Sequence, residues 1–240
     1  MIGNRTTPPK LVITLATAAL TLAAWTLPAA AASSTRSAAA LEAKAIADAE
    51  NAGWVHEVGH AKEPGHSFSA VNDIGFFEGR QIIDSDGSHA EVVQIGQQAF
   101  IRGNAKAIAN FFQLTKNEPQ QLADTWISLV PSDGDFFSTV IDAVTLKSDF
   151  GHQSIPAPVT EGHAVTVAGR RCIPITGHTS QAGVGAVTLT MCVTTSKNPL
   201  PVQLRTVSTK GTSTTTWTRW GKPVTLTTPP DAVPLASLGG

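Results

Sequence analysis

The chain has 240 residues, 42% of them hydrophobic, and its 17 basic and 18 acidic side chains give a formal net charge of -1. This balance gives no electrostatic footprint for nucleic acid or for an anionic membrane, and we expect no nucleic-acid partner. The length suits one domain with a sizeable core, and we expect a monomer without a cofactor.

The first 32 residues have the pattern of a secretory signal peptide. Arg5 and Lys10 precede an apolar run from Leu11 to Leu27, and small residues follow up to Ala32, where we expect cleavage. The predicted location is therefore secreted, either extracellular or associated with the cell envelope. Because the apolar run is slightly long for a signal peptide, a retained N-terminal anchor is the alternative. No cysteine stands at the cleavage point, which excludes lipid anchoring through this signal.

An Ala-rich stretch at residues 33–53 predicts the N-terminal helix of the domain. Gly53 suits the left-handed position that follows the last turn of a helix. Two short segments with strand character, "WVHEVGHAK" and "HSFSAVND", then flank Pro64 and Gly65. A type II turn prefers this proline-glycine pair, so the sequence predicts a β-hairpin here. The apolar stripe of the helix consists of Leu41, Ala45, Ile46 and Ala49.

Further strands and two helices are predicted between this hairpin and Val165. Turn sequences separate three apolar pairs between residues 82 and 101, and Asn104 is a typical N-cap for a helix over 104–114. A second helix is predicted from Asp135 to about Lys147.

From Val165 onward, the abundance of Thr, Ser and Val favours antiparallel strands. The predicted domain spans residues 54–234 together with the preceding helix, and residues 235–240 are expected to form a flexible tail.

The stretch "HEVGHAKEPGH" contains H-E-x-x-H and a third histidine, the ligand spacing of a zinc metallopeptidase. In such an enzyme His56, His60 and His66 bind zinc and Glu57 activates the bound water, which requires the first two histidines to lie one helical turn apart. The sequence favours a strand, because a helix here would be confined between Gly53 and the proline-glycine turn. On a strand the two histidines stand roughly 13 Å apart, too far for one zinc ion. Other interpretations are a surface metal site formed by His60 and His66 across the hairpin, or polar strand histidines without a metal.

Cys172 and Cys192 are predicted to form a structural disulfide, as an isolated pair in an exported chain usually does. Ile173 and Ile175 alternate with the first cysteine, and Met191 and Val193 with the second, so both thiols fall on the face opposite the apolar one. A hairpin loop centred on Ala182 would place the two cysteines directly opposite each other.

Three stretches of the C-terminal half, "VAGRRCIPITG", "LTMCVTTSKNPLPVQLRTVS" and "TTTWTRWGKPVTLTTPPDAV", follow one another in an order that resembles the actinobacterial LppX/LprG-like lipoproteins and their LolA-like relatives. The Ala-rich helix, the hairpin and "EVVQIGQQAFIRGNAKAI" are similar to the N-terminal half of the same family, so the resemblance covers most of residues 37–234. The chain would be a non-lipidated member, because the family's N-terminal cysteine is absent.

The resemblance implies an α+β fold in which helices cover the concave face of a strongly curved antiparallel sheet, a half-open barrel. It also implies an apolar cavity that carries acyl chains of lipids or lipoproteins, with no catalytic residues, and it places "HEVGH" on the first long strand.

We therefore predict a secreted carrier or binding protein for a hydrophobic ligand, a lipid or acyl chain, in the cell envelope. A half-barrel that does not close leaves room between apolar helices and the sheet. Two alternatives are the zinc metallopeptidase and a non-catalytic envelope interaction module with a filled core. A partner protein in the envelope or membrane fits either non-catalytic function. The residues expected to line the cavity are Phe100, Phe111, Phe112, Phe136, Phe137, Val140, Ile141, Val144, Ile173, Leu189, Met191 and Leu204.

Overall fold

The computed structural model describes residues 32–114, 119–142, 144–151 and 153–238. Apart from Ala32, the predicted signal peptide lies outside these residues. Strands of the described part are β1 (Val55–Glu63), β2 (His66–Ile74), β3 (Glu78–Ser85), β4 (Ser88–Ile95), β5 (Gln98–Gly103), β6 (Ile127–Leu129), β7 (Val159–Glu161), β8 (Val165–Val167), β9 (Arg170–Gln181), β10 (Gly185–Thr194), β11 (Pro201–Ser208), β12 (Thr212–Thr218) and β13 (Val233–Pro234).

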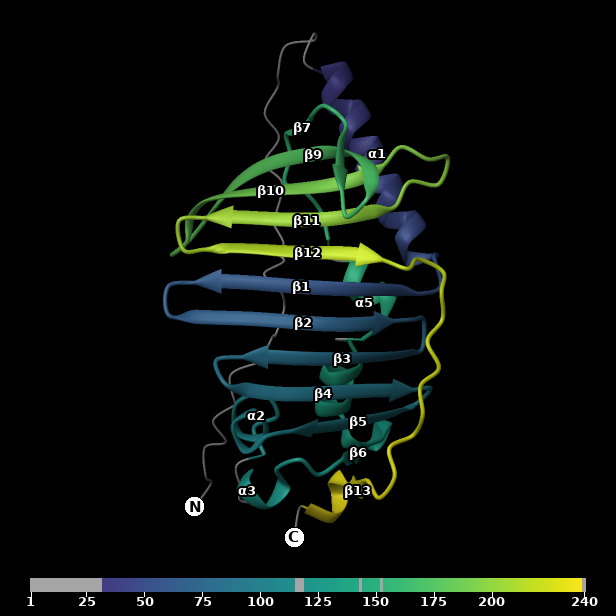
Figure 1. Ribbon diagram of the computed structural model, residues 1–240, viewed down its shortest axis with the longest axis vertical. Helices are drawn as coiled ribbons and strands as arrows, with labels where there is room; N and C mark the ends of the chain where they lie inside the picture. Colours follow the sequence, from purple (N-terminus) through teal and green to yellow (C-terminus); the bar gives the residue numbers. More distant parts are fainter. Residues whose placement is uncertain (1–31, 115–118, 143, 152, 239–240) are drawn as a thin grey trace, which may run out of the picture.

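These strands form one sheet in the order β13-β6-β5-β4-β3-β2-β1-β12-β11-β10-β9-β7, and β8 pairs with β9 (Figure 1). All pairs are antiparallel except β13 with β6. The first six strands and the later ones meet where β1 pairs with β12. Since the two ends of this path are not joined, the sheet is the half-open barrel that the sequence predicts.

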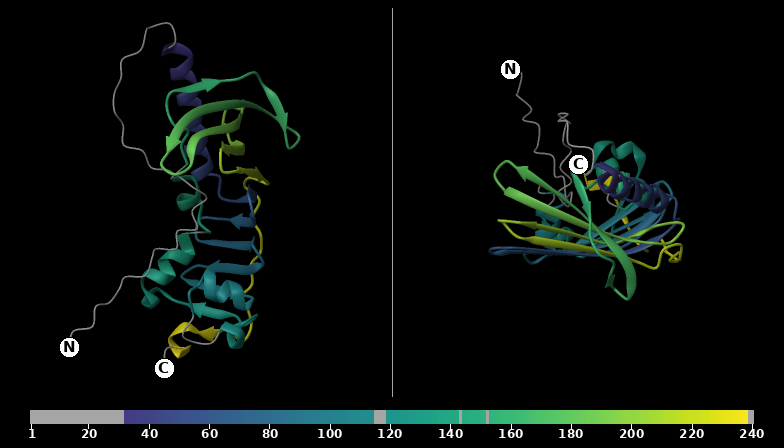
Figure 2. Two further views of the ribbon diagram at one scale, coloured as in Figure 1. Left: turned by 90° about the vertical axis from the view of Figure 1, so that its left-hand side faces the viewer. Right: turned by 90° about the horizontal axis from the view of Figure 1, so that it is seen from above.

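The described helices cover one face of the sheet, which is its concave face. The chain between β12 and β13 runs along part of the other face, which we call the open face because no described helix covers it (Figure 2). The helices are α1 (Ala32–Glu50), α2 (Ala105–Asn110), α3 (Pro119–Leu122), α4 (Asp135–Asp142) and α5 (Leu146–Gly151), with 3-10 helices η2 (Pro131–Asp133) and η3 (Leu235–Leu238). The predicted α+β class is thus confirmed. Within the described residues no helix combines the length and the apolar character that a membrane span requires.

The predicted signals for the first helix and the first hairpin are confirmed. Gly53 has a φ of 84° after the end of α1, and Gly65 has a φ of 80° in the turn between β1 and β2. Asp86 and Gly87 both have positive φ in the turn between β3 and β4, as a type I′ turn requires. Local turn chemistry therefore sets the register of these hairpins.

The two central helices are shorter than predicted. The side chain of Asn104 accepts the Ala107 N–H at 2.9 Å, as expected of an N-cap, but α2 already ends at Asn110. The predicted helix from Asp135 to Lys147 is two helices, because the N–H of Leu146 donates to the carbonyl of Gly75 at the edge of the sheet. Pairing with the sheet overrides helix propensity at this point.

The first four residues of the segment predicted to form a flexible tail lie within the described residues. They form η3, and the partly buried Leu235 and Leu238 pack against the core.

The predicted disulfide is present, but the two cysteines form a diagonal pair and do not lie directly opposite each other. The hairpin loop is centred on Gly183, so Cys172 pairs with Thr194 and Cys192 pairs with Pro174. The Cα atoms of the cysteines are 5.5 Å apart. As predicted, both thiols lie on the face opposite Ile175 and Met191, where they pack with Val202.

Replacing both cysteines with Ala is expected to lower the free energy of unfolding by about 3 kcal/mol, because the bridge constrains a loop whose ends are separated by 20 residues. Urea denaturation measures this change. The wild-type protein under reducing conditions is the control and should unfold at the same midpoint as the double variant. An unchanged midpoint in the double variant would contradict a stabilising role.

Candidate functional site

The H-E-x-x-H stretch lies on the extended strand β1, paired on both sides by β2 and β12. His56 and His60 point to the open face, and Glu57 points to the helix-covered face. Roughly 13 Å separates two residues four apart on a strand, and a zinc ion needs bonds of about 2 Å. The zinc metallopeptidase hypothesis is therefore wrong, since the two histidines cannot share a metal and the glutamate lies behind the sheet.

The alternative metal site across the hairpin is also wrong. His60 pairs with Ser69, and His66 pairs with Glu63, so side-chain alternation places the two histidines on opposite faces. Nδ1 of His66 lies 2.7 Å from Oδ2 of Asp86, and this hydrogen bond raises the pKa of the imidazole. Among the described residues no group of three or more His, Cys, Asp or Glu side chains is placed to hold a metal ion.

Glu57 is instead the centre of a buried polar cluster on the helix-covered face. It is 1% exposed, and its two carboxylate oxygens accept hydrogen bonds from two strands. Asn72 Nδ2, from β2, donates to Oε1 at 2.7 Å, and Trp217 Nε1, from β12, donates to Oε2 at 2.8 Å. The cluster thus ties together the three strands at the junction of the sheet.

Asp149 joins this cluster from helix α5. Burial raises the pKa of Asp149 well above its usual range, and the charge of Glu57 and the hydrogen bond to Glu57 raise it further. Burial also raises the pKa of Glu57, against the hydrogen bonds from Trp217 and the other donors. Two buried carboxyl groups in contact share one proton, because both cannot be ionised. We place the proton on Asp149, because its pKa is raised well above the usual value and its buried Oδ2 has no hydrogen-bond acceptor or donor assigned among the described residues.

The predicted cavity residues fall into two apolar clusters, one on each side of the central region. The α4 cluster lies between α2, α4 and strands β3 to β6, and includes Phe111, Phe112, Phe136, Phe137, Val140, Ile141 and Val144. The α1 cluster lies between α1 and strands β9 to β11, and includes Leu189, Met191 and Leu204. Phe150 and Trp217 pack between them, with ring centroids 5.3 Å apart. The apolar interior is therefore divided by an aromatic layer that contains the polar cluster.

Two predicted cavity residues are placed elsewhere. Phe100 pairs with Val93 and Ser128 and lies on the open face, because its neighbours Ala99 and Ile101 point to the helices. The prediction that Phe100 lines the interior is wrong for this reason. Ile173 pairs with Val193 on the helix-covered face, where it is half-buried outside the packed clusters.

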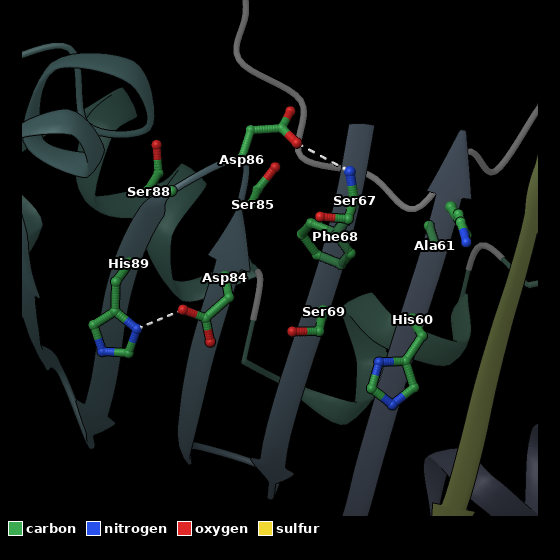
Figure 3. A pocket seen from close by; sticks show the side chains of 12 residues that line it. His60, Ala61, Ser67, Phe68, Ser69, Asp84, Ser85, Asp86, Ser88 and His89 are labelled. Carbon is green, nitrogen blue, oxygen red and sulfur yellow. Dashed lines mark hydrogen bonds and ion pairs between the residues drawn. The ribbon is translucent and has the colours of Figure 1, made fainter. Parts of the chain in front are cut away.

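A polar groove of about 440 Å³ lies at the turn ends of β1 to β4 (Figure 3). His60, Ser69, Asp84 and His89 form one row across these four strands on the open face, since each pairs with the next. Nδ1 of His89 lies 2.8 Å from Oδ1 of Asp84. Most residues around this groove are polar or charged, and the row of His60, Ser69, Asp84 and His89 lies on the face opposite the predicted apolar cavity.

Comparison with known proteins supports the fold but gives no sequence relative. No protein-family model matches the chain, and no curated protein matches it. The structure is similar to LprF from Mycobacterium bovis, with a TM-score of 0.53 and 13% identity over 81% of this chain and 97% of that chain. It is also similar to the Mycobacterium tuberculosis lipoprotein LppX, with a TM-score of 0.51 and 12% identity over 79% of this chain and 98% of that chain. At such identities the likeness shows the LolA-like fold alone.

The shared proton predicts a specific pH dependence of stability. Because the folded pKa of Asp149 lies above its unfolded value, unfolding releases a proton in the interval between the two values. Stability should be full below the ordinary pKa of a carboxyl group and should fall as pH rises towards the folded pKa. Asp149→Asn keeps a neutral donor at this position, so we expect a flatter profile as pH rises above the ordinary pKa of a carboxyl group.

Urea midpoints measured across this range test the prediction. Asp142→Asn, at the exposed end of α4, is the matched control and should keep the wild-type slope. A wild-type slope in Asp149→Asn would show that Asp149 does not hold the proton.

Proposed function

We propose that the protein is a secreted carrier that holds the acyl chain of a lipid between its sheet and its helices. The observation that carries this proposal is an open sheet whose apolar concave face is covered by separate helices, most of which, unlike α1, are short. A closed barrel or a second sheet would fix the interior, whereas short helices can move apart with the loss of few hydrogen bonds.

Several features of the two apolar clusters support a chain-shaped apolar ligand. Half-buried apolar side chains border both clusters, so apolar surface continues from the packed interior to the edge. Such borders are typical of sites that admit a hydrophobic ligand. These residues are Phe111, Leu114, Phe136 and Ile141 at the α4 cluster, and Leu41, Leu189 and Leu204 at the α1 cluster.

The location of the carrier in the cell envelope is part of the proposal. The disulfide between Cys172 and Cys192 supports an oxidising compartment. The resemblance to the LppX/LprG-like lipoproteins implies the same compartment, and the fold shared with LprF and LppX supports it.

Protein purified from its own host tests the proposal directly. Organic extraction and native mass spectrometry should find a lipid that co-purifies in stoichiometric amount. An empty protein, together with no binding of a fluorescent fatty acid, would favour the alternative of an interaction module with a filled core.

Variants of the partly buried face of α4 should weaken ligand retention. For Phe136→Asp combined with Ile141→Asp, we expect at least a tenfold loss of bound fluorescent fatty acid, because each charge would lie against the acyl chain. Val71→Asp, on the open face and 38% exposed, is the matched control and should bind as the wild type does. Leu189→Asp probes the α1 cluster separately and shows which cluster holds the chain.

Circular dichroism and urea denaturation establish that each variant is folded. If both folded cluster variants bind the fatty acid as tightly as Val71→Asp does, the ligand does not lie between the sheet and the helices.

A further inference from the structure

The turn between β2 and β3 exposes two adjacent aromatic side chains. Phe76 is 48% exposed and Phe77 is 77% exposed, and their ring centroids lie 6.5 Å apart. Exposed phenylalanines that stand side by side form an apolar patch, and such patches mark interaction surfaces.

Three backbone hydrogen bonds fix the conformation of this turn and therefore keep both rings exposed. The N–H of Gly75 donates to the carbonyl of Glu78 at 2.8 Å, and the N–H of Gly96 donates to the carbonyl of Phe77 at 3.1 Å. The carbonyl of Gly75 also accepts the N–H of Leu146 at 3.0 Å. A side chain at Gly75 would collide with the Glu78 carbonyl and with the ring of Trp54, so close packing beneath the turn also fixes it.

Trp54, in the loop after α1, links this turn to the chain segment that follows β12, which carries exposed basic residues. Trp54 packs against Gly75, and its carbonyl accepts the N–H of Gly221 at 2.8 Å. Arg219 and Lys222 flank this glycine, and both are exposed. Within the described residues neither basic side chain takes part in an ion pair. We call Trp54, Phe76, Phe77, Arg219 and Lys222 the aromatic-basic rim.

Other basic residues occur on elements that reach the same side of the sheet. The turn after β10 and the start of β9 lie at the strand ends where β2 turns into β3 (Figure 1), and these segments contain Lys197, Arg170 and Arg171. Glu78, which is half-buried, is the acidic residue next to the two rings.

We propose that the aromatic-basic rim docks the protein on the surface of an anionic lipid bilayer. Phenylalanine rings at the tip of a turn project outward, and the boundary between headgroups and acyl chains accommodates such a projection. Basic side chains around inserted rings gain attraction from anionic headgroups, by about 1 kcal/mol for each charge near the surface. The proposal deepens the function proposed above, because a lipid carrier must meet a membrane, but its test does not depend on a bound ligand.

Co-sedimentation with lipid vesicles tests the rim in the protein recovered from its own host. We expect binding to vesicles that contain phosphatidylglycerol and much weaker binding to vesicles of phosphatidylcholine alone. Phe76→Ser combined with Phe77→Ser should lower the partition coefficient by at least about tenfold. Val165→Ser, which removes an apolar side chain that is 43% exposed on β8, is the matched control and should leave binding unchanged.

Charge reversal at the rim has a different expected signature. Arg219→Glu combined with Lys222→Glu should weaken binding to the phosphatidylglycerol vesicles by at least about tenfold and reduce the dependence of binding on salt. Brominated lipids should quench the fluorescence of Trp54, and the quenching should be lost in Trp54→Phe.

Three results would overturn the membrane proposal. The first is no binding to phosphatidylglycerol vesicles, and the second is unchanged binding in the folded Phe76 and Phe77 variant. The third is a dimer in solution that dissociates in this variant, because the rim would then bind a second copy of the chain. Lipid extracted from the same variant separates the two proposals. A rim variant that keeps its bound lipid but loses vesicle binding supports docking, and a lipid-free wild type that still binds vesicles contradicts only carriage.

Discussion

The buried carboxylate of Glu57 accepts the hydrogen bonds that join the strands at the junction of the sheet, with Asp149 of helix α5 beside it. The strands of the N-terminal half and those of the C-terminal half meet where β1 pairs with β12, and Glu57 and Trp217 face each other across this pair. Asn72 adds the next strand through its bond to Glu57. Buried hydrogen-bond networks specify one arrangement, because every alternative leaves a polar group without a partner. The cluster therefore fixes both the register of the junction and the place of the helix above it.

The position of the cluster also determines what the interior can hold. Apolar clusters lie on both sides of it, and the rings of Phe150, Trp217 and Trp220 lie between these clusters. The ring centroids of Phe150 and Trp220 are 5.4 Å apart. A long acyl chain that spans both clusters has to pass this layer, and α5 is the element that would have to move.

Most of the fold follows from local patterns in the sequence. The glycines and prolines at the turns, the alternation in the strands and the cap at Asn104 all act over a few residues, and the structure contains each of them. Interruption of the helix after Asp142 depends on Gly75, which is distant in the sequence, and no local pattern indicates it. The sequence assigns Phe100 to the wrong face for a similar reason. Phe100 and Ile101 are both apolar and consecutive, so the local pattern does not decide which of them faces the helices.

The buried cluster was only partly visible in the sequence. Glu57 alternates with Val55 and Gly59, and Asn72 alternates with Ala70 and Ile74, so each polar side chain occupies a position with the parity of a buried apolar residue. This parity is a signal that a buried polar network is present. Its partner Asp149 lies on a short helix whose placement depends on the whole fold, so the sequence did not reveal the pair.

The H-E-x-x-H stretch shows why the period of a motif matters more than its letters. On a helix, residues four apart lie on the same side one turn apart, and the intervening glutamate remains close to their metal. On β1 the same letters send His56 and His60 to the open face and Glu57 to the interior. Nδ1 of His56 lies 2.8 Å from Oδ1 of Asp73 on the neighbouring strand, and Nδ1 of His89 lies at the same distance from Oδ1 of Asp84. These are cross-strand pairs of a sheet surface. The glutamate that would have activated water in an enzyme here accepts the hydrogen bonds that close the core.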